Sequence, residues 1–217
     1  MTWTISRRHH RPHRAVRLAV VLAVSLGSLA VAGSEATGVG VVPAAAEELP
    51  PGFRDTAVIA GLTDPTVVRF AADGRVYVAE KSGIIKVFDD LGDRTPTVVA
   101  DLRTQVHNYW DRGLLGFNLD PQFPAEPFLY VLYVRDAAVG AVAPRWGTPG
   151  TSSDPCPTPP GPLTDGCVVS GRLSRLRLDG DTVTGGEQVL VDDWCQQYPS
   201  HGPGDIEFGA DGSLYAS

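Results

Sequence analysis

The sequence predicts an all-β protein built from repeated four-stranded sheets, which is the architecture of a β-propeller. The run Phe70-Ala-Ala-Asp73-Gly74-Arg-Val-Tyr-Val-Ala79 returns near the end of the chain as Phe208-Gly-Ala-Asp211-Gly212-Ser-Leu-Tyr-Ala216. A looser copy begins at Phe117, 47 residues after the first copy and 91 residues before the last. A spacing near 45 residues, lengthened once by an insertion, is typical of propeller blades.

Each of the two close copies is predicted to contain an apolar strand, an Asp-Gly turn and a second strand, because Asp-Gly tolerates the positive φ of a tight hairpin. The predicted strands of the first blade are 66–70, 75–80, 83–88 and 96–102, and those of the second blade are 114–119, 128–134, 172–178 and 187–191. A third blade has only begun at Ser217. We therefore expect the N-terminal portion, about two and a half blades, of a larger propeller. A short β-sandwich built from the same hairpins is the alternative.

An arginine-rich N-terminus precedes an apolar stretch from about Val16 to Ala32, and small residues at 30–32 and 44–46 offer cleavage sites. This pattern is typical of a secretory signal peptide. The stretch is short for a membrane span and is interrupted by an arginine and a Gly-Ser pair. We therefore expect a signal peptide and export region at 1–46, no stable membrane span, and a secreted, extracellular product.

The remaining chain divides into a short Pro-containing linker at 47–52 and the predicted propeller portion at 53–217. Within the second blade, residues 140–165 are rich in Pro, Gly, Ser and Thr, and we expect them to form an inserted loop. Long loops in propellers lie over one end of the channel where ligands bind. The loop is therefore either a lid over that end or a surface decoration.

The chain contains three cysteines, and an exported chain is expected to form disulfides. Cys156 and Cys167 bracket the Pro-rich part of the insertion and are the predicted pair. Cys195 is then left either to pair with a cysteine beyond residue 217 or to remain as a buried free thiol.

The charge balance limits the classes of partner. Without residues 1–46 the chain has 13 basic and 24 acidic residues, a net charge of −11. Nucleic acids and anionic membrane surfaces require a basic face, so neither is an expected partner. A neutral or cationic small molecule fits this charge better.

The segment 192–205 carries aromatic, amide, hydroxyl and imidazole side chains in the predicted loop that enters a blade's innermost strand. Such loops line the mouth of a propeller's axis, where side chains converge on a central ligand. His201 is the candidate catalytic residue, because an imidazole titrates near neutrality and accepts a proton from a hydroxyl group. Gly202 and Gly204 would leave room for a ligand. A histidine that only completes loop hydrogen bonds is the alternative.

A second candidate site, Trp110-Asp111-Arg112-Gly113, comes directly before the apolar strand at 114–119. Asp111 and Arg112 would offer a carboxylate and a guanidinium fork to a polyhydroxylated or carboxylated ligand. The alternative is a structural ion pair that ties adjacent blades together. Acidic groups at 89–90, 179–181 and 192–193 lack the dense spacing of a calcium-binding loop, so the metal ligands stay unknown.

Three groups of residues, taken in this order, resemble the glucose/sorbosone dehydrogenase family of six-bladed propellers. The groups are Asp64-Pro65 with Phe70-x-x-Asp73-Gly74-Arg75 and Glu80-Lys81-x-Gly83-x-Ile85, Arg112-Gly113-Leu114-Leu115-Gly116-Phe117 with Asp120-Pro121-x-Phe123, and Ser200-His201 with Phe208-x-x-Asp211-Gly212-x-Leu214-Tyr215. The resemblance runs from about Gly52 to Ser217. It implies that the chain is the N-terminal portion of a six-bladed propeller.

This family includes soluble sugar dehydrogenases that use pyrroloquinoline quinone (PQQ) and calcium. In these enzymes a histidine before the corresponding strand takes the proton of an aldose's anomeric hydroxyl while hydride passes to the quinone, which gives the lactone. The resemblance implies that His201 is this base and that PQQ and calcium are the cofactors, with most of their binding residues beyond Ser217. It also implies that an aldose or related carbohydrate and an external electron acceptor are the partners.

Two positions beside the implied substrate and cofactor depart from the family pattern. Asp111 stands where the enzymes usually have glutamine, and Ser200 stands where many have aspartate. The acidic-Arg-Gly-Leu-Leu-Gly pattern is also similar to the hedgehog-interacting branch, in which the propeller is a binding module. The alternative function is therefore a secreted propeller that binds a protein or glycan without redox chemistry. Calcium-dependent lactone hydrolysis, as in other six-bladed propellers, is a third class.

Overall fold

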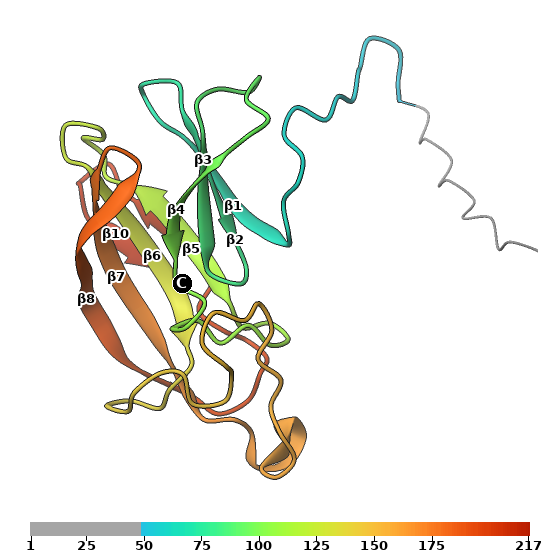
Figure 1. The fold of residues 1–217 in the computed structure, drawn as a ribbon, viewed down its shortest axis with the longest axis vertical. Coiled ribbons are helices and arrows are strands. Elements are labelled where there is room, and N and C mark those ends of the chain that lie inside the picture. Colours follow the sequence, from blue (N-terminus) through green and yellow to red (C-terminus); the bar gives the residue numbers. More distant parts are fainter. Residues whose placement is uncertain (1–48) are drawn as a thin grey trace, which may run out of the picture. The chain divides into compact units, whose positions relative to one another are not determined.

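Ten β-strands and one short π-helix make up the regular structure of residues 49–217 in the computed structural model (Figure 1). These are the residues that the structure describes. The signal peptide predicted at 1–46 lies outside them, as does the start of the predicted linker. Within the described part, no helix has both the length and the apolar character that crossing a bilayer requires.

The strands form two four-stranded antiparallel sheets and a third sheet of two strands, each ordered as the chain runs. The first sheet comprises β1 (Pro65–Phe70), β2 (Val76–Glu80), β3 (Ile84–Phe88) and β4 (Thr97–Asp101). The second comprises β5 (Leu114–Leu119), β6 (Phe128–Arg135), β7 (Val169–Asp179) and β8 (Thr182–Gln196). The third pairs β9 (Ile206–Phe208) with β10 (Leu214–Ala216). Two complete blades and the start of a third confirm the predicted partial propeller.

The sequence repeat is also a repeat of hydrogen bonds. In the first copy, Ala71 N donates to Arg75 O at 2.9 Å across a turn in which Gly74 has φ +96°. In the last copy, Gly209 N donates to Ser213 O at the same distance, and Gly212 has φ +80°. In both turns the aspartate before the glycine accepts the backbone N–H two residues on. The Asp-Gly pair therefore fixes the same hairpin twice.

The first two sheets pack face to face through one hydrophobic cluster. It contains Tyr77, Ile85 and Val87 from the first sheet and Phe117 and Leu129 from the second, all essentially buried. Burial of each large side chain stabilises the fold by roughly 1.5–3 kcal/mol. Two polar contacts fix the register of this packing at the start of β5. Leu114 N donates to Lys81 O, and Thr66 Oγ1 donates to Leu114 O, both at 2.8 Å.

The outer strands of the second sheet are longer than the sequence predicted. β7 has 11 residues and β8 has 15, joined by a turn in which Gly180 has φ +59°. The pairing shifts register at three places, including Leu176/Arg177, and such bulges let a strand continue through an irregular hydrophobic pattern. The prediction that 192–205 is entirely a loop was therefore wrong for 192–196, which belong to β8.

The insertion predicted at 140–165 lies between β6 and β7, at the end of the second sheet opposite the β7–β8 turn (Figure 1). It contains the π-helix η1 (Gly161–Asp165). Cys156 and Cys167 form the predicted disulfide, with their Cα atoms 5.7 Å apart. The insertion is thus a loop closed on itself by a covalent bond.

Leu129→Ala is expected to lower the free energy of unfolding by about 2–5 kcal/mol, because it leaves a cavity between the two sheets. Leu163→Ala is the matched control, since this leucine is 74% exposed in η1 and its truncation should change stability by about 0.5 kcal/mol or less. Denaturant unfolding of both variants measures the difference. Equal losses would contradict the assignment of the core.

Candidate functional site

A cavity of about 480 Å³ lies at the end of the second sheet where the chain passes from β8 into β9. Its wall is formed by the end of β8, the turn that follows and the end of β10, through Trp194, Cys195, Gln196, His201, Gly202, Pro203, Ala216 and Ser217. His201, the candidate catalytic residue, is an exposed member of this wall. The residues of the wall thus include one histidine, one glutamine, one tryptophan, one cysteine and one serine.

The backbone holds His201 in an uncommon conformation. Its φ is +61°, which few residues other than glycine adopt. Gln196 Nε2 donates to His201 O at 3.1 Å, and His201 N donates to Asp111 Oδ2 at 3.4 Å. Side chains on both sides of the turn therefore fix the backbone from which the imidazole projects.

The structure brings the two candidate segments of the sequence together. Asp111 accepts the N–H of His201 and also donates its own N–H to Pro199 O at 3.2 Å. The preceding residue, Trp110, has φ +52°, and Lys81 Nζ donates to its carbonyl oxygen at 2.5 Å. Of the three positive-φ residues other than glycine within 49–217, two therefore lie in segments that are bonded to each other. Strained backbone of this kind clusters at functional sites.

Arg112 is buried and is not among the residues that line the cavity. Its Nη1 donates to Cys167 O at 2.8 Å, and its Nη2 donates to Gln197 O at 3.0 Å. Burial lowers the pKa of the guanidinium to about 10. The guanidinium fork binds carbonyl oxygens of two loops rather than pointing toward the cavity.

His107 lies beside Arg112, with its Nδ1 3.3 Å from Arg112 Nη1. Burial and, second, the guanidinium charge lower its pKa to about 3, so the ring is neutral at physiological pH. Its Nε2 is buried and has no hydrogen-bond partner. Nδ1 faces the guanidinium and acts there as an acceptor.

Two buried carboxylates anchor the insertion. Asp136 accepts the N–H groups of Trp146 and Gly147, and Asp154 accepts the N–H of Asn108 at 3.0 Å. Burial raises the pKa of both carboxyl groups, while these backbone hydrogen bonds oppose the rise. His107, Asp136 and Asp154 were not predicted as site residues, because an isolated polar residue outside the strands carries no pattern.

Cys195 and Ser200 are the remaining candidate residues from the sequence. Cys195 is exposed and forms no disulfide within residues 49–217, so the alternative of a buried thiol was wrong, and a pair with a cysteine beyond residue 217 stays a prediction. It stands in β8 within the cavity wall. Ser200 is half-buried and does not line the cavity.

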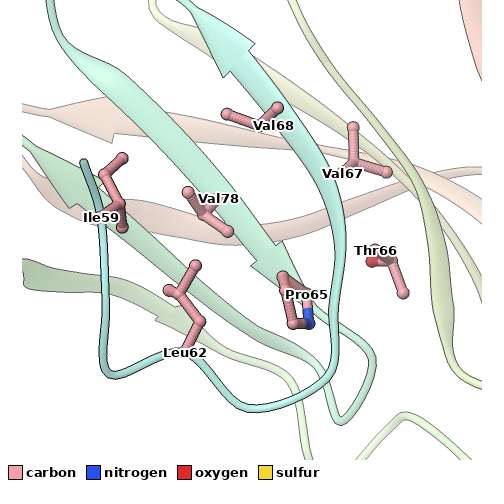
Figure 2. A pocket seen from close by; sticks show the side chains of 7 residues that line it. All are labelled: Ile59, Leu62, Pro65, Thr66, Val67, Val68 and Val78. Carbon is pink, nitrogen blue, oxygen red and sulfur yellow. The ribbon is translucent and has the colours of Figure 1, made fainter. Parts of the chain in front are cut away.

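A second cleft, of about 320 Å³, lies on the first sheet beneath the segment that leads into β1 (Figure 2). Aliphatic side chains dominate its lining, with Ile59, Leu62 and Val78 gathered on one side. The hydroxyl of Thr66, its only polar side-chain group, is already bonded to backbone carbonyl oxygens. The cleft offers no group for proton transfer, so the cavity at His201 is the better candidate site.

The described residues do not by themselves form a site for PQQ and calcium. The wall of the cavity contains no lysine or arginine that could pair with the carboxylates of the quinone. Within residues 49–217, no cluster of three or more His, Cys, Asp or Glu residues could hold a metal ion. The acidic group at 89–90 instead caps its own turn, where Asp90 Oδ1 accepts the N–H of Gly92. No chemical step through the quinone follows from these residues alone.

A model of the glucose/sorbosone dehydrogenase family matches residues 62–217, and the chain belongs to this family. No curated protein sequence matches the chain. The order of the three motif groups in the sequence agrees with this assignment, and so does the blade structure.

The chain is also similar to parts of solved structures. A Thermus thermophilus protein assigned as an oxidoreductase of the glucose dehydrogenase type has 27% identity and a TM-score of 0.54, over 75% of this chain and 38% of that one. PQQ-bound aldose sugar dehydrogenase from Streptomyces coelicolor has 19% identity and a TM-score of 0.49, over 74% and 39%. Apo aldose sugar dehydrogenase from Escherichia coli has 16% identity and a TM-score of 0.44, over 72% and 38%. The matched part of this chain therefore corresponds to less than half of each of these proteins.

Acid should destabilise the protein through His107. Its pKa is lower in the folded state, about 3, than the ordinary value of 6.5, so the unfolded chain binds more protons between these values. The stability that this neutral ring contributes is complete above about pH 6.5 and is lost as the pH falls toward 3. His107→Gln removes the titration, and we expect its free energy of unfolding to fall less between pH 7.5 and pH 4.5. Equal losses in both proteins would refute this assignment.

Proposed function

We propose that this chain is the N-terminal portion of a secreted quinoprotein that oxidises the anomeric hydroxyl of an aldose to the lactone. The observation that carries the proposal is the position of His201, an imidazole in the wall of a cavity, in a chain that belongs to the glucose/sorbosone dehydrogenase family. The chain spans 38% of the Thermus structure. The activity, the aldose, the external electron acceptor and secretion are all parts of this proposal.

His201 would accept the proton of the anomeric hydroxyl at an imidazole nitrogen. His201 bonds to Gln196 through its carbonyl oxygen and to Asp111 through its backbone N–H, so neither bond uses the imidazole. The ring would therefore be available to a ligand. Trp194 in the same wall supplies an indole, and such rings pack against the apolar faces of sugars. PQQ, with calcium, is the proposed hydride acceptor, and its cationic partners would lie beyond residue 217.

A secreted propeller that binds a protein or glycan without redox chemistry is the second candidate. One observation favours it. The Asp111 side chain accepts the N–H of His201, which is a structural use of the position where the enzymes usually have glutamine.

His201→Asn in the complete protein is expected to lower aldose turnover by roughly two to four orders of magnitude, because the variant cannot accept the hydroxyl proton. Tyr215→Phe is the control, since it removes one exposed hydroxyl from β10 that bonds to Asp211 outside the cavity wall. A dye-linked assay under saturating PQQ and calcium measures both. Undiminished turnover in His201→Asn would end the proposed role of the imidazole.

The cofactors have a test of their own. Addition of PQQ and calcium to the purified complete protein should produce aldose-dependent dye reduction, and a calcium chelator should abolish it. Quinone binding is followed separately by the absorbance of PQQ after gel filtration. If the protein binds no quinone, the non-catalytic binding propeller replaces the enzyme as the proposed function.

A further inference from the structure

We propose that Arg112 is a positioning residue for His201, because it fixes the segment 197–201 against the disulfide loop 156–167. This inference deepens the proposed function and rests on it. Arg112 itself touches no part of the cavity, so its effect would pass through the backbone that presents the imidazole.

The guanidinium of Arg112 binds two loops. Arg112 donates to the carbonyl oxygen of Cys167, which closes the disulfide loop, and to that of Gln197, four residues before His201. Among the side chains that the structure describes, none forms an ion pair with Arg112. Burial of a cation is costly unless its donors are bonded, and the two carbonyl oxygens accept from both terminal nitrogens of Arg112. The side chain therefore joins these loops directly.

Asp111, the residue before Arg112, binds the same segment. Asp111 binds Pro199 O through its N–H and His201 N through its carboxylate. Residues 111 and 112 together thus hold positions 197, 199 and 201. Their own place is fixed in turn, because Leu114 N donates to Lys81 O of the first sheet. The segment that carries His201 is therefore tied to the rigid packing of the two sheets.

The disulfide loop and the segment 197–201 are also in direct contact. A Cβ atom added to Gly166 would lie 2.2 Å from Gln197 O, far inside van der Waals contact. Tyr198 Oη also donates to Thr164 O at 3.4 Å. The disulfide loop is thus a wall against which the segment rests, and Arg112 bonds both sides of that contact.

The test begins with hydrogen exchange in the complete protein, which needs no activity. Arg112→Met removes the two bonds but fills the same buried space. We expect the amides of 197–202 to exchange about tenfold faster or more, because local opening becomes easier, while those of β2 and β3 stay unchanged. Arg112→Lys keeps the charge and should recover part of the protection. Unchanged exchange at 197–202 in Arg112→Met would overturn the proposal.

The second readout is a double-mutant cycle in the aldose assay. Arg112→Met should lower kcat/KM by roughly 10- to 100-fold, the scale expected for a misplaced reacting group. In the His201→Asn background it should cause no further loss, since the residue on which it acts is absent. A general loss of folding would instead multiply the two effects, and that result would also overturn the proposal.

Two glycine variants in the disulfide loop test the same contact. Gly166→Ala would push Gln197 away, whereas Gly161→Ala meets only the side chain of Thr158 at 3.7 Å. Both glycines have positive φ, at +67° and +78°, so both variants carry backbone strain. We expect faster exchange at 197–202 in Gly166→Ala alone. Equal exchange in the two variants would count against the contact.

The two proposals fail in different ways. If the wild-type protein oxidises no aldose, the proposed function fails, and hydrogen exchange still decides whether Arg112 holds the segment. If aldose oxidation is found but Arg112→Met keeps full kcat/KM, the dehydrogenase stands and the positioning role is refuted.

Discussion

The packing of the second sheet against the first is the constraint on which the rest of the structure depends. The shared cluster draws buried side chains from both sheets, and the bond from Leu114 N to Lys81 O sets where β5 begins along the first sheet. The residues just before Leu114 are Asp111 and Arg112, so their place follows from that register. The turn that carries His201 is then bonded to Asp111. A feature of the hydrophobic core thus determines where a polar loop lies.

A buried polar layer extends this order beyond the ends of the strands. His107, Arg112, Asp136 and Asp154 are all within 2% of full burial. The two carboxylates accept backbone N–H groups, and the guanidinium donates to backbone carbonyl oxygens. Irregular loops have many backbone groups without a strand partner, and buried groups of this kind require one. The charged side chains supply those partners, which lets a Pro- and Gly-rich insertion pack without a hydrophobic core of its own.

The fold was predictable from the sequence because local patterns determine it. Asp-Gly turns at 73–74 and 211–212, alternating apolar strands and the spacing of the copies are all read within short windows. β8 is longer than predicted, because bulges and cross-strand pairing with β7 sustain a strand that its own residues do not indicate.

The candidate site was only partly predictable. Its candidate residues were found because imidazole and guanidinium groups stood in predicted loops, whereas the bond that joins Asp111 to His201 was not predicted. The role of Arg112 depends on carbonyl oxygens at positions 167 and 197, and every residue has a carbonyl group, so no sequence pattern marks such an acceptor.

The free thiol of Cys195 makes the cavity open to chemical labelling. Within residues 49–217 the other two cysteines are joined to each other, so a maleimide dye would react with this part of the chain at one position. That position lies in the cavity wall together with His201 and Trp194. A fluorophore there would report on its surroundings, and its emission would register the arrival of any ligand, whether substrate, quinone or protein.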